Sequence, residues 1–327
     1  MKMKLLLSKE YVTQAAKRVD EATKHVALIA MVIADHPATH ELIEALLRAA
    51  KRGVNVSVAA DIFTYGEVSG SFLPLRYDSK GSRAATTMAR RLRAGGVKFT
   101  WLGHGRITLF NGRTHSKWCV VDDTVFSFGG VNMYQEGIEN TDYMLETKDP
   151  VLADTLIKEQ QRILRAERAS QNFPSHSLAL DEQSIALFDG GIIGHSLIYR
   201  RACELARKAE SVLFVSQYCP TGKLSRILKQ KPYRLYFNRR EQASLLNRIL
   251  LWFSTTVSGL RTEYEKQPYL HAKFIIFTMP DGKKVAISGS HNFAYTGVLF
   301  GTREIALETK DPAIIEQLES FVKQHVA

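Results

Sequence analysis

The sequence predicts an α/β protein built from two similar halves. The chain has 327 residues, which is enough for two domains of about 150 residues each. Apolar strand patterns alternate with helical patterns, and one polar motif occurs twice, once in each half. We therefore expect residues 1–170 and 171–327 to form two related domains. Each should be a mixed, largely parallel sheet flanked by helices, and a pseudo-two-fold axis should relate them.

The first half begins with a repeated alternation of helix and strand. A helical pattern over Glu10 to Thr23 precedes the apolar run Val26 to Ile33, which is typical of a strand buried on both faces. A helix that starts after Thr39 ends at Arg52-Gly53, and a strand follows over Val54 to Ala60. This half closes with a helix from Pro150 to about Arg168.

The second half repeats that order. A helix is expected over Ser196 to Ala209, followed by a strand over Ser211 to Gln217, a short helix near Leu224 to Leu228 and a strand over Tyr233 to Asn238. The segment Glu241 to Phe253 is also helical in pattern, with a broad apolar face. Packing against the core is the default explanation for this face. A helix that dips into a membrane surface is the alternative.

The first polar motif lies between Thr114 and Asn132. His115 and Lys117 are two residues apart in a run of strand formers, so both should project from one face of a strand. A second strand leads into Gly129-Gly130-Val131-Asn132, where glycine permits close approach of the backbone and Asn132 adds an amide donor. An imidazole, an ammonium and an amide together suit an oxyanion such as phosphate.

A second copy of this motif indicates that the pattern is a repeat. His271 and Lys273 have the same spacing, and Gly289-Ser290-His291-Asn292 follows. The similarity extends further, because Glu-Thr-Lys-Asp-Pro occurs at 146–150 and again at 308–312. Just before these segments, Asp142 and Glu304 lie ten and twelve residues after the two asparagines. Each half therefore carries a histidine, a lysine, an asparagine and an acid.

These residues resemble the phospholipase D superfamily, whose members pair two His-x-Lys-(x)4-Asp motifs. The Gly-Gly-x-Asn segment looks like that of bacterial cardiolipin synthases. The resemblance implies that His, Lys and Asn of both motifs face one phosphate, whereas the motif aspartate, here Asp122, is structural. The second copy departs from the pattern, because Thr278 occupies the aspartate position.

The motif residues suggest a reaction on a phosphodiester. Two imidazoles can divide the roles of nucleophile and acid, so we assign His115 to a phosphohistidine intermediate and His271 to protonation of the leaving alcohol, with the opposite order left open. Lys117, Lys273, Asn132 and Asn292 would neutralise and orient the phosphate oxygens. Asp142 and Glu304 would hold the far nitrogens of the imidazoles. Gly130 and Ser290 are candidates for contact with the phosphate, and no metal or other cofactor is required.

Charge and composition narrow the range of partners. The net charge is +11, and two stretches ahead of the motifs, 76–113 and 223–248, carry +8 and +7. We expect an anionic phosphodiester substrate: a phospholipid at a membrane surface, with DNA or RNA as the alternative and a non-catalytic phosphate-binding protein as a third reading. Three dispersed cysteines indicate a reducing compartment. The protein is expected to be cytoplasmic and to act as a monomer. Peripheral contact with the inner face of the membrane is the open alternative.

Overall fold

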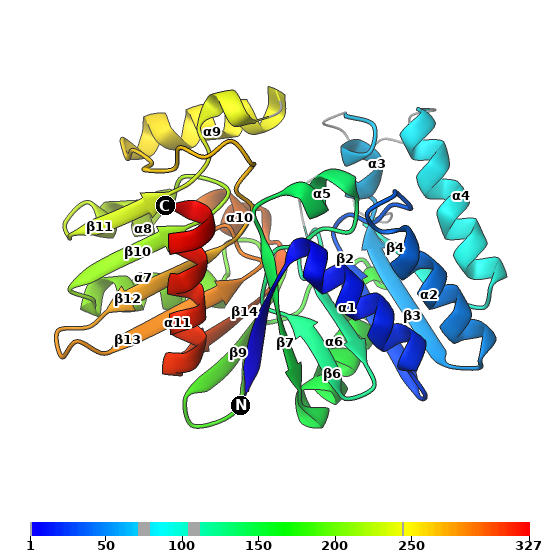
Figure 1. Ribbon diagram of the computed structural model, residues 1–327. Coiled ribbons are helices and arrows are strands. Elements are labelled where there is room, and N and C mark those ends of the chain that lie inside the picture. Colours follow the sequence, from blue (N-terminus) through cyan, green and yellow to red (C-terminus); the bar gives the residue numbers. More distant parts are fainter. Residues whose placement is uncertain (1, 71–78, 104–111, 244) are drawn as a thin grey trace.

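The computed structural model describes residues 2–70, 79–103, 112–243 and 245–327, which form two seven-stranded sheets flanked by helices (Figure 1). The first sheet has the order β1-β7-β6-β5-β2-β3-β4. Its strands are β1 (Met3–Leu7), β2 (His25–Ala30), β3 (Asn55–Asp61), β4 (Lys98–Leu102), β5 (Trp118–Val121), β6 (Thr124–Ser127) and β7 (Tyr143–Lys148). The second has the order β11-β10-β12-β13-β14-β9-β8. Its strands are β8 (His176–Ala179), β9 (Ser184–Gly190), β10 (Ser211–Val215), β11 (Tyr233–Tyr236), β12 (Phe274–Thr278), β13 (Lys284–Gly289) and β14 (Arg303–Thr309).

The repeat seen in the sequence is a repeat of topology. Six strands of each sheet occur in the same spatial order, with β9, β14, β13, β12, β10 and β11 corresponding to β1, β7, β6, β5, β2 and β3. The expected α/β class with two similar halves is therefore confirmed. The expectation of largely parallel sheets is wrong, because among the strands that the structure describes β2-β3-β4 and β10-β11 pair in parallel and the other neighbours pair antiparallel. Short turns join β5 to β6 and β12 to β13, and a short turn can only produce antiparallel neighbours.

The helices form three layers around the two sheets. The outer face of the first sheet packs against α1 (Ser8–Glu21), α2 (His40–Lys51) and α4 (Lys80–Ala94). Between the sheets lies a shared apolar core with α6 (Pro150–Arg168) and α11 (Pro312–Phe321). The outer face of the second sheet is covered by α7 (Leu197–Lys208), α8 (Gly222–Leu228) and α9 (Leu245–Ser258). Shorter helical segments are α3 (Phe63–Glu67), α5 (Gln135–Glu139), η1 (Arg240–Gln242), α10 (Tyr295–Phe300) and the C-terminal η2 (Val322–Val326).

The two helices of the shared core, α6 and α11, begin in the repeated sequence segments. Asp149 and Asp311, the aspartates of the repeated Glu-Thr-Lys-Asp-Pro segments, each accept a hydrogen bond from a backbone N–H in the first turn of α6 and α11. Proline then occupies the first helical position, where it has no hydrogen bond to lose. The repeated segments therefore end equivalent strands and begin the two helices of the shared core.

Candidate active site

Reciprocal backbone contacts join the two halves at the motifs. The N–H groups of His115 and Ser116 donate to the carbonyl of Arg303 at 2.8 and 2.9 Å, and Arg303 N–H donates to the carbonyl of Arg113. The other motif repeats this pattern with Thr141, which receives hydrogen bonds of 3.0 Å from His271 and Ala272 and donates to Tyr269. Two equivalent contacts of this kind are what a two-fold relation between the halves produces. Each motif histidine is thereby fixed beside the acid-bearing strand of the opposite half.

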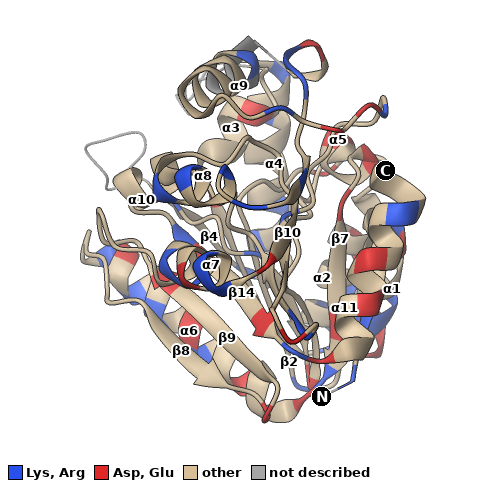
Figure 2. Cartoon of the chain, turned by 90° about the vertical axis from the view of Figure 1, so that its left-hand side faces the viewer, with Lys and Arg blue, Asp and Glu red and all other residues tan. Residues whose placement is uncertain are grey.

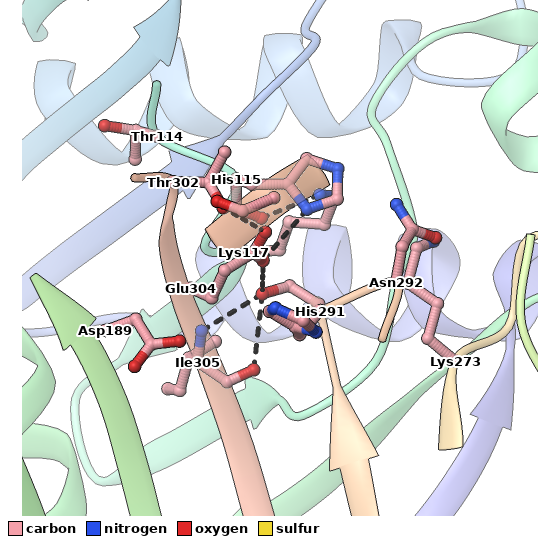
Figure 3. A network of polar contacts seen from close by, with 12 residues as sticks. Thr114, His115, Lys117, Asp189, Lys273, His291, Asn292, Thr302, Glu304 and Ile305 are labelled. Atoms are coloured by element: carbon pink, nitrogen blue, oxygen red, sulfur yellow. Dashed lines mark hydrogen bonds and ion pairs between the residues drawn. The ribbon is translucent and has the colours of Figure 1, made fainter. Parts of the chain in front are cut away.

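Each imidazole is paired with a carboxylate from the other half. His115 Nδ1 lies 2.9 Å from Glu304 Oε2, and His271 Nδ1 lies 2.6 Å from Asp142 Oδ2 (the first pair is shown in Figure 3). All four side chains are buried. Because an ionised carboxylate can only accept, the proton of each neutral imidazole must lie on Nδ1. The Nε2 lone pair of each ring is then available to a ligand.

Both lysines lie in the same buried cluster. Lys117 Nζ donates to the carbonyl of His115 at 2.8 Å, and Lys273 Nζ donates to the carbonyl of His271. Burial, together with repulsion from the other lysine, lowers the pKa of Lys117 to about 7. Burial lowers the pKa of Lys273 to about 8, although Asp142 and Glu304 oppose that shift. The effect of Lys273 on the pKa of Lys117 is consistent with cations of both halves lying close together.

The histidines are neutral in the unliganded cluster at physiological pH. Burial lowers the pKa of His115 to about 4, against the attraction of Glu304. Burial and the neighbouring Lys273 lower the pKa of His271 to about 3. Burial opposes ionisation of Glu304, but the nearby His115, His291 and Lys117 outweigh it and lower the pKa of this carboxyl to about 2. An anion placed between these groups would favour protonation of both histidines and both lysines.

Asn132 follows the first Gly-Gly turn and is buried. Its Oδ1 atom has no hydrogen-bond partner among the described residues. A buried amide end without a partner is costly, and a ligand or water in the site would supply one. Its counterpart Asn292 is partly exposed, and Ser216 Oγ donates to its backbone carbonyl at 3.0 Å.

The two halves support their acids differently. Ser290 Oγ and Thr302 Oγ1 both donate to the Glu304 carboxylate. Figure 3 shows Thr302 beside this carboxylate. The Ser290 hydroxyl is fully buried in this contact, so the structure directs it to Glu304, whereas the sequence had suggested contact with a phosphate. Thr302 was not singled out from the sequence, although its position two residues before Glu304 was an available signal. Both residues hold Glu304 in place for His115.

Gly130 occupies the position equivalent to Ser290, and it packs directly against the other acid. A Cβ at Gly130 would lie 2.7 Å from Asp142 Oδ2 and 2.9 Å from the carbonyl oxygen of His271. We expect Gly130→Ala to displace Asp142 from His271 and to lower turnover by roughly 10–100-fold, because small misplacements of catalytic groups are costly. Steady-state kinetics would measure the loss. Gly297→Ala is the matched control, since a Cβ there meets nothing closer than 3.5 Å.

Asp122 and Thr278 lie at the far ends of β5 and β12 from the histidines. Asp122 accepts hydrogen bonds from the N–H groups of Thr23, Lys24 and His25 and from the Thr23 hydroxyl. It therefore anchors the start of β2. Thr278 is part of β12, and its carbonyl accepts a hydrogen bond from Glu210 N–H. Replacement of aspartate by threonine in the second motif removes an anchor and leaves the chemical groups of the site unchanged.

Two other expectations about placement are modified by the structure. The histidine and lysine of each motif lie in extended segments just before β5 and β12, and not within the strands. The cations of the basic stretch 76–113 are also not all directed to solvent, because Arg113 is buried against Asp61 and Arg91 pairs with Asp35 and Glu44. Residues 76–78 and 104–111 of this stretch lie outside the described residues.

The fold has two α/β halves, with paired His-x-Lys motifs and reciprocal acids at their junction. Residues 16–164 match the family model described as cardiolipin synthase, PLD-like domain. This part of the chain, which holds the first motif, is therefore similar to phospholipase D-like domains. A comparison with curated proteins gave no significant match.

Solved structures share this fold over nearly the whole chain. Phosphatidylserine synthase from Haemophilus influenzae Rd KW20 superposes with a TM-score of 0.75 and 14% sequence identity, covering 99% of this chain and 86% of that one. Polyphosphate kinase from Porphyromonas gingivalis superposes with a TM-score of 0.62 and 12% identity, covering 98% of this chain and 46% of that one. At these identities the likeness concerns the fold.

Proposed function

We propose that the protein cleaves a phosphodiester of a phospholipid through a phosphohistidine intermediate and passes the phosphatidyl group to an alcohol or to water. The observation that carries this proposal is the reciprocal pairing of His115 with Glu304 and of His271 with Asp142. It provides two oriented imidazoles beside two buried lysines. The match of the first half to a cardiolipin synthase, PLD-like domain favours a phospholipid as the substrate.

In the first step His115 acts as the nucleophile. Its Nε2 lone pair forms a bond to phosphorus while the bond between phosphorus and the leaving oxygen breaks. His271, protonated at both nitrogens, gives its Nε2 proton to the departing alkoxide. Burial keeps His271 neutral in the empty cluster, so the negative charge of the bound phosphodiester must favour the protonated form before it can act as the acid.

In the second step an acceptor attacks the phosphohistidine. Neutral His271 takes the proton of the attacking water or alcohol, a new P–O bond forms and the P–N bond to His115 breaks. Lys117 and Lys273 counter the charge on the non-bridging oxygens throughout, and Asn132 offers its amide to the same group. The cycle returns both imidazoles to their starting states. Water as acceptor gives hydrolysis, and an alcohol gives transfer.

Binding of an anion should be accompanied by proton uptake. The pKa values of Lys117 and Lys273 are lowered to about 7 and about 8. At pH 8, therefore, a fraction of the molecules carries one or both of these lysines without its extra proton. An anion raises these pKa values, and the complex must take up protons from the buffer. We expect the protein to take up about one proton for each vanadate that it binds at pH 8. Titration calorimetry in buffers of different ionisation enthalpy would measure this uptake. Uptake should fall in Lys117→Met. An enthalpy independent of the buffer would contradict this charge assignment.

Chelation should leave turnover unchanged. In the described part of the chain, one group of side chains, Asp35, His40 and Glu44, is close enough to share a metal ion, and it lies outside the cluster. Arg91 already pairs with both of these carboxylates. The site's positive charge comes from its lysines, so we expect less than about twofold loss of activity in excess EDTA. Strong inhibition that added Mg²⁺, Ca²⁺ or Zn²⁺ reverses would show that a metal takes part.

The substrate class is tested by product analysis. The purified protein would be incubated separately with phosphatidylglycerol, with phosphatidylcholine and with single-stranded DNA, with and without an added alcohol. Release of the head group, or its exchange for the added alcohol, is the expected result. Cleavage of DNA with both lipids left intact would overturn the proposal.

A nuclease is the second candidate function, and one surface favours it. A pocket of about 600 Å³ between α7, α8 and α10 is lined by Arg200, Arg207, Lys223 and the partly exposed Tyr295, among other residues. Lysine and arginine are prominent on α7 and α8 in this region (Figure 2). Cations beside an aromatic ring suit a nucleic-acid strand. This candidate predicts DNA or RNA binding whose affinity falls steeply with salt.

A further inference from the structure

Helix α9 presents an apolar face to solvent. Ile249, Trp252, Phe253 and Val257 are each between 50% and 59% exposed. Their spacing along the sequence places them on one side of the helix. The buried residues Leu251, Ser254 and Ser258 attach the helix to the second half. Figure 1 shows α9 at the edge of the molecule, above the ends of β10 and β11. The explanation of this segment as a core helix is therefore wrong for its outward side.

Cations border this face. Arg248 on the helix and Arg239 and Arg240 just before it are exposed. Arg240 reaches along the helix and donates to Thr255 Oγ1 at 3.2 Å, and Arg239 pairs with the exposed Glu265. Large exposed apolar patches mark binding surfaces, and an apolar helical face with Trp, Phe and flanking arginines fits the boundary between the head groups and acyl chains of an anionic membrane. None of the described helices is both long enough and apolar enough to cross a bilayer.

The helix is tied to the strand ends that carry the site. Asn238, between β11 and η1, donates from Nδ2 to the carbonyl groups of Gln217 and Leu270. Its Oδ1 accepts from Leu270 N–H at 2.8 Å. Leu270 immediately precedes His271. A surface bound to α9 would therefore lie at the same end of the second sheet as the catalytic cluster.

We propose that the face formed by Ile249, Trp252, Phe253 and Val257 docks the protein onto an anionic lipid surface. The four side chains enter the head-group boundary, and the bordering arginines contact lipid phosphates. This inference rests on the proposed function, because docking by α9 would bring phospholipids in the membrane to the histidines. It accounts for an exposed apolar face at the end of the molecule where the substrate must arrive.

Tryptophan fluorescence provides a direct test. Trp101 and Trp118 are buried, so Trp252 is the tryptophan that solvent reaches. We expect vesicles of phosphatidylglycerol and phosphatidylcholine to shift the emission to the blue and to shield it from iodide, with a weaker effect of phosphatidylcholine alone. Trp252→Phe should still bind vesicles in a flotation assay but without the spectral change. Trp252→Ser combined with Phe253→Ser should weaken vesicle binding by about tenfold or more.

The control is Val151→Ser, which changes an exposed apolar residue in the first turn of α6, beyond the end of β7 opposite Asp142. It should bind vesicles as the unmodified protein does. Unchanged binding by the Trp252/Phe253 double variant would overturn the proposal. So would a stable dimer that this variant converts to a monomer, with no vesicle binding in either case, because a second copy would then cover α9.

Activity assays distinguish the proposed docking through α9 from the proposed reaction on phospholipids. The double variant should cleave a soluble short-chain phosphodiester at the normal rate, because the exposed side chains of Trp252 and Phe253 are not among the groups of the catalytic cluster. It should lose activity on vesicles. Vesicle binding through α9 without turnover of any phospholipid would support docking and refute the proposed reaction. Turnover of phospholipid in vesicles that the double substitution leaves unchanged would refute docking and support the reaction.

Discussion

His115→Ala and His271→Ala should each abolish turnover of a phospholipid while the protein stays folded. In the proposed mechanism each imidazole has a separate task on one phosphorus atom, so neither can replace the other, and losses of roughly 10³–10⁶-fold are expected for residues that act as a unit. Burial is the main cause of the lowered pKa of each histidine, and the lysine of the other motif adds to it in both cases, Lys273 for His115 and Lys117 for His271. Release of the head group would measure turnover, and thermal unfolding would check the fold.

His115→Ala and His271→Ala should block different steps of the reaction. A nitrophenyl phosphodiester has a leaving group that needs no acid, so His271→Ala should still form the covalent adduct and release about one equivalent of nitrophenolate in a burst. His115→Ala should give no burst. The reverse pattern would exchange the two roles and keep the shared site. His40→Ala is the matched control, since His40 is exposed on α2 and far from the motifs in sequence. Substantial phospholipid turnover by either catalytic variant would refute a site shared by the two halves.

The sequence predicted the members of the cluster because the repeat preserves their types and spacing. Two copies of His-x-Lys, each followed by an asparagine and an acid, could be recognised without any structure. The sequence could not show which acid reaches which histidine, because spacing within a half says nothing about contacts across the junction. Those contacts are set by the backbone hydrogen bonds of Arg303 and Thr141 to the opposite motifs.

Other errors have physical causes of the same kind. The pattern of α9 shows apolar residues on many sides, and only packing reveals that Leu251 points inward while its neighbour Trp252 points outward. Ser290 has a hydroxyl where Gly130 has none, which suggested a phosphate contact. In the fold this hydroxyl is directed to Glu304, because the acid of the second half has the longer side chain and approaches from β14.

Each half supplies the acid that pairs with the histidine of the other half, Glu304 with His115 and Asp142 with His271. Glu304→Gln should impair the function of His115, and Asp142→Asn should impair that of His271, each by roughly 10²–10⁴-fold in phospholipid turnover, as expected when an orienting carboxylate becomes an amide. An amide can donate to Nδ1 and so stabilise the tautomer with the proton on Nε2. That tautomer has no lone pair at the position that must attack phosphorus.

The nitrophenyl substrate shows which acid serves which histidine. Glu304→Gln should slow the burst that His115→Ala abolishes, because adduct formation depends on the nucleophile. Asp142→Asn should resemble His271→Ala and leave most of the burst. Pairing within each half would give the opposite grouping, with Asp142→Asn suppressing the burst and Glu304→Gln preserving it. Proton–nitrogen NMR of the imidazoles tests the same point without turnover. Glu304→Gln should change the tautomer of His115 and leave that of His271 unaltered, because the 2.6 Å contact between His271 and Asp142 does not involve Glu304.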